Sequence, residues 1–200
     1  AGKESLFSLY SFFKVAEIGG LMLFPVVTRK IGRQQVFRMA TILPMFGLIT
    51  LFISGLIAPQ SILFISVSAV LLNLGSGFLL GSTTVMLADI VDYGEYKLGS
   101  RNESIIFSAQ TLLVKLASAL SGWLIGVGLS LIGYVAGAAV QSNITIIGIR
   151  VIMTIIPSIV ALVMYVIYKS KYKINGSFHD EILQVIGSRK KVKVLNINNK

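Results

Sequence analysis

Five long apolar segments constrain this chain more than any other feature of its sequence. A helix needs about 20 mostly apolar residues to cross a hydrocarbon core of roughly 30 Å, and each segment is long enough. Because backbone polar groups must be satisfied within a bilayer, such segments fold as helices. The expected spans are residues 6–28, 36–57, 62–88, 105–134 and 144–168.

The composition agrees with an all-α integral membrane fold. Apolar residues make up 54% of the chain, charged residues make up 13%, and the mean hydropathy is +0.83. Eighteen Lys and Arg against eight Asp and Glu give a formal charge of +10, which is also typical of nucleic-acid-binding proteins. The basic residues lie in the connections and the tail, however. We therefore expect a lipid bilayer as a partner and no nucleic acid.

The basic residues also predict an orientation. Lys and Arg close to a span tend to stay on the cytoplasmic side. They alternate here with the uncharged connections APQ and VAGAAVQSN, consistently along all five spans. We therefore expect a multi-pass plasma-membrane protein whose first residues lie outside and whose tail lies in the cytoplasm. The basic residues concerned are Arg29, Lys30, Arg33, Arg38, Lys97, Arg101, Lys169, Lys171 and Lys173.

The chain divides into a transmembrane region, residues 1–174, and a cytoplasmic tail, residues 175–200. Asp180 and Glu181 followed by SRKKVK predict a short amphipathic tail helix that lies against anionic lipid headgroups. Five spans that begin outside are unusual for a complete transporter, whose half commonly has six helices. We therefore expect that one further helix precedes Ala1.

The most informative polar residue within a span is Lys115. A charge in mid-span costs about 2.5 to 3.5 kcal/mol on insertion scales, so it is retained for function by default. Helical spacing places Thr111 on the same face, with Gln110 and Val114 beside it. This stripe predicts either hydrogen bonding to a hydroxylated ligand or a lysine that senses cation-loaded carboxylates. The alternative is a structural stripe between helices with a permanently paired lysine.

A second cluster of charges follows the third span. Asp89 and Asp92 lie one helical turn apart at the end of an apolar run, where unpaired carboxylates would be costly. We expect Arg33, Lys97 or Arg101 to meet them. Such ion pairs can close a cytoplasmic gate and break when it opens, although a solvated loop is the alternative.

Other intramembrane features favour structural roles. Lys14 and Glu17 have the spacing of a self-neutralising pair in the first span, with a direct contact to ligand or cation as the alternative. Small residues in the third and fourth spans predict close helix contacts, and prolines in or near spans predict kinks. These residues are Gly75, Gly77, Gly81, Gly122, Gly126, Gly128, Pro25, Pro44 and Pro157.

Enzymatic chemistry has no recognisable signature in the sequence. The chain has no cysteine, and His179 is its one histidine, so no metal site or thiol catalysis is predicted. No nucleotide-binding, metalloprotease or serine-hydrolase motif occurs. We therefore predict a protein that is not an enzyme and that uses no cofactor.

Residues 88–134, ADIVDYGEYKLGSRNESIIFSAQTLLVKLASALSGWLIGVGLSLIGY, strongly resemble the glycoside-pentoside-hexuronide cation symporters of the major facilitator superfamily. FP followed by RKIGR, the GIR spacing before Pro157 and the exit YKSKYKINGS are also similar, so the resemblance covers nearly the whole chain. It implies the C-terminal part of a twelve-helix transporter. The five spans would match helices eight to twelve.

The resemblance implies a substrate site on the fourth span. Lys115 matches a lysine that is essential to coupling, near both sugar and cation, and Gln110, Thr111 and Val114 match positions of the sugar site. Leu80 stands where a sugar-contacting aromatic residue occurs in the family. The acidic residues that ligate the cation belong to the N-terminal half, so the sequence leaves open whether the coupling ion is Na⁺ or H⁺.

The resemblance also implies a gate, because Asp89 and Arg101 match charges that help to seal the inward end and Arg33 matches a third. We therefore predict part of a secondary active transporter that couples uptake of a glycoside, pentoside or hexuronide to a monovalent cation by alternating access. A sugar sensor that does not transport, or a truncated transporter remnant, is the alternative.

Overall fold

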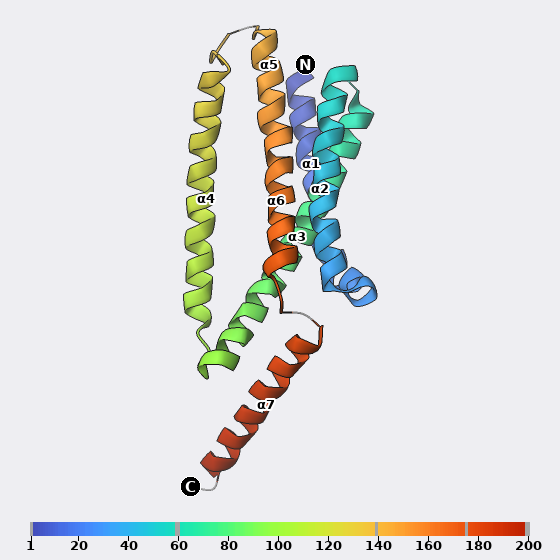
Figure 1. Cartoon of the computed structure of the whole chain (residues 1–200). Helices are drawn as coiled ribbons and strands as arrows, with labels where there is room; N and C mark the ends of the chain where they lie inside the picture. The colour runs from blue at the N-terminus through green and yellow to red at the C-terminus, as the bar shows by residue number, and fades with distance from the viewer. Residues whose placement is uncertain (1, 59–60, 139, 175, 199–200) are drawn as a thin grey trace.

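The computed structural model describes residues 2–58, 61–138, 140–174 and 176–198, with the side chains of all of these except 2–12, 176, 177, 190 and 192–198. Every regular element in this described part is a helix (Figure 1). In chain order the elements are α1 (Gly2–Ile31), α2 (Arg33–Ile57), α3 (Ile62–Leu98), α4 (Glu103–Leu131), α5 (Asn143–Arg150), the π-helical η1 (Val151–Ile155), α6 (Ile156–Lys171) and α7 (Gly176–Asn198).

Four described segments are long and apolar enough to cross a membrane, and they match the second to fifth expected spans. They are Arg33–Ile57, Ile62–Leu98, Glu103–Leu131 and Asn143–Lys171, the last being the continuous run of α5, η1 and α6. The first expected span lies within α1, which is not one of these four, so a fifth crossing remains a prediction. The chain is an all-helical membrane protein, as its sequence predicts.

The third helix continues beyond the expected end of its membrane span. The sequence places a connection after residue 88, yet α3 continues through DIVDYGEYKL to Leu98. Hydropathy marks where a helix leaves an apolar layer, whereas unwinding needs a helix-breaking signal. That signal comes at Gly99, whose φ of 73° is left-handed and whose N–H donates to the Glu95 carbonyl.

The stretch RKIGRQQ, which lies between the first two expected spans, is also mostly helical. Arg29 and Lys30 lie in the last turn of α1, and α2 begins at Arg33, so Gly32 alone separates the two helices. Gly32 has a φ of 84°, which favours glycine. Arg33 is thereby held at the very start of α2. We call the end of the bundle that carries Arg29, Lys30, Arg33, Lys97, Arg101, Lys169 and Lys171 the basic end.

Helices α1, α2 and α3 form the packed centre of the structure (Figure 1). A buried cluster of Phe24, Val36, Ala40 and Phe78 joins all three. The expected role of glycines in close packing is confirmed on α3, because a Cβ on Gly77 would lie 2.1 Å from the Glu17 carbonyl oxygen of α1. Two backbones can approach this closely only where one side chain is absent.

Helix α4 stands to one side of this centre (Figure 1). It joins α3 at the basic end and α5 at the other end, and none of its described residues is buried. The close contacts predicted for Gly122 and Gly126 are not made within the described chain, since nothing in it lies within 4 Å of a Cβ built at either position, and they stay a prediction. A sequence pattern predicts that a helix can pack closely without indicating what lies beside it.

Helix α7 differs from the short tail helix that the sequence predicts. It is 23 residues long and packs along the basic end of α3. Ile182 and Ile186 are buried within the protein, so these apolar side chains are not available to lipid. Phe178 makes edge contacts with Tyr93 and Tyr96 of α3. The Arg189 guanidinium adds a hydrogen bond to the Tyr96 carbonyl oxygen at 2.9 Å.

Candidate functional site

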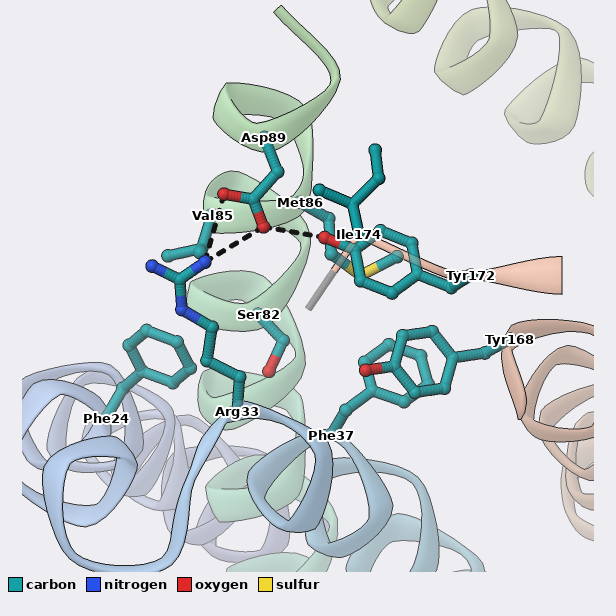
Figure 2. A pocket seen from close by; sticks show the side chains of 10 residues that line it. All are labelled: Phe24, Arg33, Phe37, Ser82, Val85, Met86, Asp89, Tyr168, Tyr172 and Ile174. Carbon is teal, nitrogen blue, oxygen red and sulfur yellow. Dashed lines mark hydrogen bonds and ion pairs between the residues drawn. The ribbon is translucent and has the colours of Figure 1, made fainter. Parts of the chain in front are cut away.

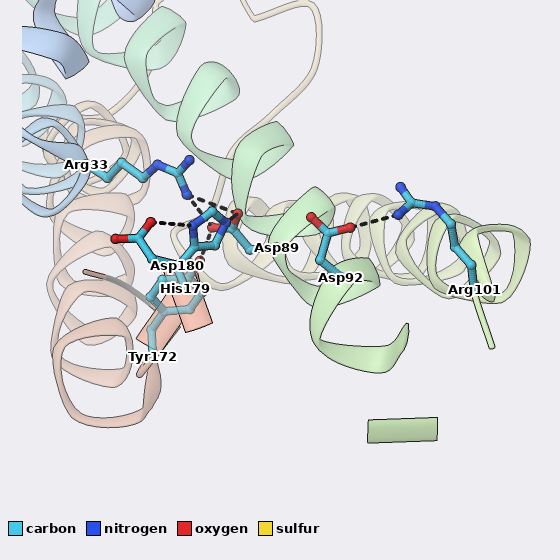
Figure 3. A network of polar contacts seen from close by, with 7 residues as sticks. All are labelled: Arg33, Asp89, Asp92, Arg101, Tyr172, His179 and Asp180. Carbon is cyan, nitrogen blue, oxygen red and sulfur yellow. Dashed lines mark hydrogen bonds and ion pairs between the residues drawn. The ribbon is translucent and has the colours of Figure 1, made fainter. Parts of the chain in front are cut away.

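The Asp89 carboxylate is the centre of a polar network at the basic end (Figure 3). Arg33 Nη1 donates to its two oxygens at 3.0 and 3.1 Å, and the Tyr172 hydroxyl donates to Oδ2 at 2.6 Å. His179 Nε2 lies 3.1 Å from Oδ1, and Asp180 lies 4.0 Å from the other ring nitrogen of His179. Asp89 is buried, and these donors compensate for the lost hydration of its charge.

Four elements meet at this single carboxylate. Arg33 begins α2, Asp89 lies on α3, Tyr172 follows the end of α6 and His179 lies in the first turn of α7. The predicted meeting of Asp89 with Arg33 is confirmed. Tyr172 and His179 were not predicted from the sequence. They are 83 and 90 residues from Asp89, and no local pattern in the sequence indicates either contact.

A small cavity of about 20 Å³ lies directly beneath the network (Figure 2). The rings of Phe24, Phe37 and Tyr168 line it together with Ser82 of α3. The Ser82 hydroxyl is buried and has no hydrogen-bond partner among the described residues. A cavity of this size holds about one water molecule. The Asp89 network therefore lies over a narrow space whose lining is mostly aromatic and aliphatic.

Tyr172 is held in its protonated form. Burial, followed by the hydrogen bond to Asp89, raises the pKa of Tyr172 above its ordinary value of 10. The phenol is thus a permanent donor to Asp89 at physiological pH. Its ring stacks on that of Tyr168 at 5.1 Å, and Tyr168 stacks on Phe37 at 3.7 Å. These three stacked rings connect the network to the buried Phe37 side chain of α2.

Arg101 belongs to a separate set of contacts. Its Nη1 lies 2.8 Å from Asp92 and 3.1 Å from Glu95, and its Nε pairs with Glu103. The hydrogen bonds that Arg101 donates to the Glu103 and Glu95 carboxylates raise the pKa of Arg101, so it remains charged. The predicted contact of Asp92 with Arg101 is therefore confirmed. Together these contacts connect the end of α3 to the start of α4. Figure 3 shows the pair of Asp92 with Arg101.

Lys97 is not an ion-pair partner of either aspartate in the described part of the chain. Its ammonium lies 5.7 Å from the centre of the Tyr93 ring on the same helix. The four predicted gate residues thus form two groups, Arg33 with Asp89 and Asp92 with Arg101. The structure does not join Arg101 to Asp89.

The predicted substrate stripe lies on the exposed surface of α4. Lys115 and Thr111 border a shallow open groove formed by this helix alone, together with Ser104 and Ser108. Gln110 and Val114 do not line that groove. The two serines were not predicted, although they continue the helical spacing of Thr111 and Lys115 towards the basic end.

The geometry of Lys115 suits a site near the middle of a membrane. At 1.5 Å per residue it lies roughly 18 Å from the start of α4 and roughly 24 Å from its end. No carboxylate contacts its ammonium among the residues that the structure describes. The Thr111 hydroxyl donates to the Phe107 carbonyl and keeps an oxygen available as an acceptor. This face of α4 therefore presents an ammonium and hydroxyl groups, and no other described helix contributes to the groove.

The remaining charged pair within a predicted span is local. Lys14 Nζ lies 2.7 Å from Glu17 Oε2, one helical turn away on α1. The self-neutralising pair predicted from their spacing is therefore present.

Comparison with known proteins identifies the family. Residues 1–176 match the family described as "MFS/sugar transport protein". The chain is 32% identical over 198 residues to a protein of Salmonella typhimurium named "Putative sulfoquinovose importer", which covers 98% of this chain and 41% of that protein. It is 32% identical to the "Uncharacterized symporter YjmB" of Bacillus subtilis, over 82% of this chain and 35% of that protein.

A third relative is the "Isoprimeverose transporter" of Lactiplantibacillus pentosus, 36% identical over 58% of this chain and 24% of that protein. The chain spans about two fifths of the length of the first relatives that it matches. The resemblance predicted from residues 88–134 is thereby confirmed. With four segments of its described part long and apolar enough to cross a membrane, and a match over most of its length, this chain belongs to the family of major-facilitator sugar transport proteins.

Proposed function

We propose that this chain is the C-terminal part of a secondary active transporter that couples uptake of a glycoside, pentoside or hexuronide to Na⁺ or H⁺. Family membership supports the class of substrate, and two relatives carry the names of a sulfoquinovose importer and an isoprimeverose transporter. The observation that carries the proposal is Lys115, an ammonium in mid-span beside Thr111 with no ion pair in the described part of the chain. Such charges in a membrane serve function by default.

The sugar site requires a second wall. The groove on α4 is open, and no described residue of this helix is buried. We propose that an N-terminal half of the same polypeptide faces α4 and supplies the carboxylates that bind the cation, and we call the two together the complete transporter. Lys115 would then sense whether those carboxylates are loaded, while Gln110, Thr111 and Val114 contribute to the sugar site.

The basic end is the proposed cytoplasmic side, in a plasma membrane, with α7 in the cytoplasm. The excess of Lys and Arg at this end supports that orientation. Arg33 with Asp89, and Asp92 with Arg101, would then act as the cytoplasmic gate of an alternating-access cycle. Tyr172 and His179 extend the first of these pairs to two further helices.

Sugar-triggered cation flux tests the proposal. The complete transporter is expressed in cells, and pH and Na⁺ electrodes record flux after addition of glycosides, pentosides or hexuronides. We expect one sugar class to drive flux of one cation, and Lys115→Ala to abolish the coupled flux. Ser118→Ala serves as the matched control, since among the described residues its hydroxyl bonds to the Val114 carbonyl of the same helix and to no other group.

Two results would contradict the proposal. If Lys115→Ala coupled sugar uptake to cation flux as well as the wild type does, Lys115 would have no role in coupling. No flux from the complete transporter, when it is inserted in the membrane, would favour a sensor or a transporter remnant.

A further inference from the structure

A second polar groove lies at the basic end, on the side of α2 and α6, with a volume of about 330 Å³. Arg38 and Lys169 line it, one from each helix, together with two glutamines and three tyrosines. No carboxylate lines it, and neither cation makes an ion pair with a described residue. The polar residues that complete its lining are Gln34, Gln35, Tyr165, Tyr168 and Tyr172.

The donors of this groove select an anion. Guanidinium and ammonium groups provide only hydrogen-bond donors, and the amides and phenols add further donors. Two neighbouring cations without a carboxylate repel each other, so a bound anion would relieve that repulsion. A phosphate group presents several acceptor oxygens, and both Arg and Lys bind it well. A neutral sugar or a metal cation would leave both positive charges unpaired.

The surroundings of the groove favour a phosphate that is attached to acyl chains. Met39 lies beside Arg38 on α2, and Val166 and Ile167 precede Lys169 on α6. All three apolar side chains are exposed. Both helices belong to membrane-spanning segments, and tyrosines such as Tyr165 are typical of the membrane interface. Basic pockets between helices on the cytoplasmic side bind anionic lipid headgroups.

We propose that this groove binds the phosphate of an anionic phospholipid headgroup, with Arg38 and Lys169 as its charge partners. The site also touches the gate, because Tyr172 lines the groove and donates its hydroxyl to Asp89. Figure 2 shows the Tyr172 hydroxyl directed at that carboxylate, with the Tyr168 ring on the far side of Tyr172 from Asp89. A bound lipid would therefore rest against Tyr172, one of the three residues that contact Asp89.

Native mass spectrometry of the complete transporter tests the site directly. Dioleoylphosphatidylglycerol is titrated into the purified protein in detergent, with dioleoylphosphatidylcholine as the zwitterionic reference and inorganic phosphate as the water-soluble competitor. The double variant Arg38→Gln, Lys169→Gln should bind phosphatidylglycerol roughly 30-fold more weakly, because each basic residue near a membrane surface contributes to binding. The measurement reads binding without transport, so it can fail while the proposed function holds.

The matched control is Lys30→Gln, Lys173→Gln, which removes the same charge from the basic end outside the groove. We expect the affinity of this control for phosphatidylglycerol to fall by no more than about threefold, whereas the affinity of the groove variant should fall by roughly 30-fold. Equal losses in both double variants would overturn the site in favour of diffuse attraction. Equal binding of phosphatidylcholine would also overturn it. Displacement of the lipid by millimolar phosphate would show a site for a free anion and overturn the assignment to lipid.

Discussion

The sharpest prediction concerns Asp89→Asn. The substitution keeps the shape of the side chain and removes the charge on which Arg33, Tyr172 and His179 converge. If these contacts hold the basic end closed, their loss should expose the small cavity beneath them. The reporter is Ser82→Cys, because Ser82 lines that cavity, is buried and makes no hydrogen bond to a described residue.

The expected magnitude follows from the contacts. The pair with Arg33 contributes only about 0 to 1 kcal/mol, since the Arg33 side chain is 45% exposed and its charge is screened by water. The Asp89 side chain is 4% exposed, and a hydrogen bond to a charged group contributes about 1.5 to 3 kcal/mol. Taking the lower figure, about 1.5 kcal/mol, for each of the two contacts of Asp89 with Tyr172 and His179 gives a total of about 3 kcal/mol in favour of the closed form. This corresponds to about 100-fold in the equilibrium between closed and open forms.

The assay is the rate at which a membrane-impermeant maleimide labels the introduced thiol in inside-out vesicles. The chain contributes no cysteine of its own, so the label reports Ser82→Cys without interference from native thiols of this chain. Asp89→Asn should raise the labelling rate by about 100-fold, as worked out above. Ser100→Cys, in the exposed connection between α3 and α4, should label at the same rate in both backgrounds.

Charge exchange gives the complementary test. Arg33→Asp combined with Asp89→Arg should restore much of the protection, because the two side chains face each other. Arg101→Asp combined with Asp89→Arg should not, since Arg101 contacts Asp92, Glu95 and Glu103 instead. Labelling that stays within about threefold of wild type in Asp89→Asn would refute the reasoning, as would equal rescue by both exchanges.

Two further predictions concern a hydroxyl and a glycine. Because the pKa of Tyr172 is raised, the phenol keeps its donating proton below pH 10 and loses it only as the pH rises through that higher pKa. Tyr172→Phe should therefore speed labelling at Ser82→Cys by about tenfold, relative to the protein with Tyr172, at both pH 6 and pH 9. A ratio of labelling rates that differs between the two pH values would count against the assignment. Gly77→Ala should destabilise the protein by about 1 to 3 kcal/mol, because the new Cβ would meet the Glu17 carbonyl, whereas Gly122→Ala should not destabilise it. Thermal unfolding in detergent measures both glycine variants, and equal melting temperatures would contradict the packing of α1 on α3.

The positions of the membrane helices could be predicted because the signal is local. A run of apolar residues identifies each of the second to fifth spans, and this signal does not depend on which helices pack beside it. Helix ends were predicted less well, as α3 shows, because hydropathy falls at Asp89 while the backbone keeps its helical hydrogen bonds to Leu98. Gly99, not the change in polarity, ends the helix.

The candidate site was predictable only in part. Asp89, Asp92, Arg33 and Arg101 could be singled out because charges beside an apolar run are costly. Their pairing depends on how α2, α3 and α4 lie against one another. The contribution of His179 had no signal in the sequence, since a histidine in a polar tail is unremarkable until α7 is seen to pack on α3.

By itself the sequence determined an all-helical membrane protein, the order of its apolar spans and, through the motif at residues 88–134, its family. These properties follow from the free energy of transferring each segment into a bilayer, which depends on its own residues. Only the tertiary structure decided that Asp89 is shared by Arg33, Tyr172 and His179, and that α4 carries Lys115 on an unburied helix. Those outcomes depend on contacts between residues distant in sequence, such as Gly77 with α1, which set how closely the helices approach.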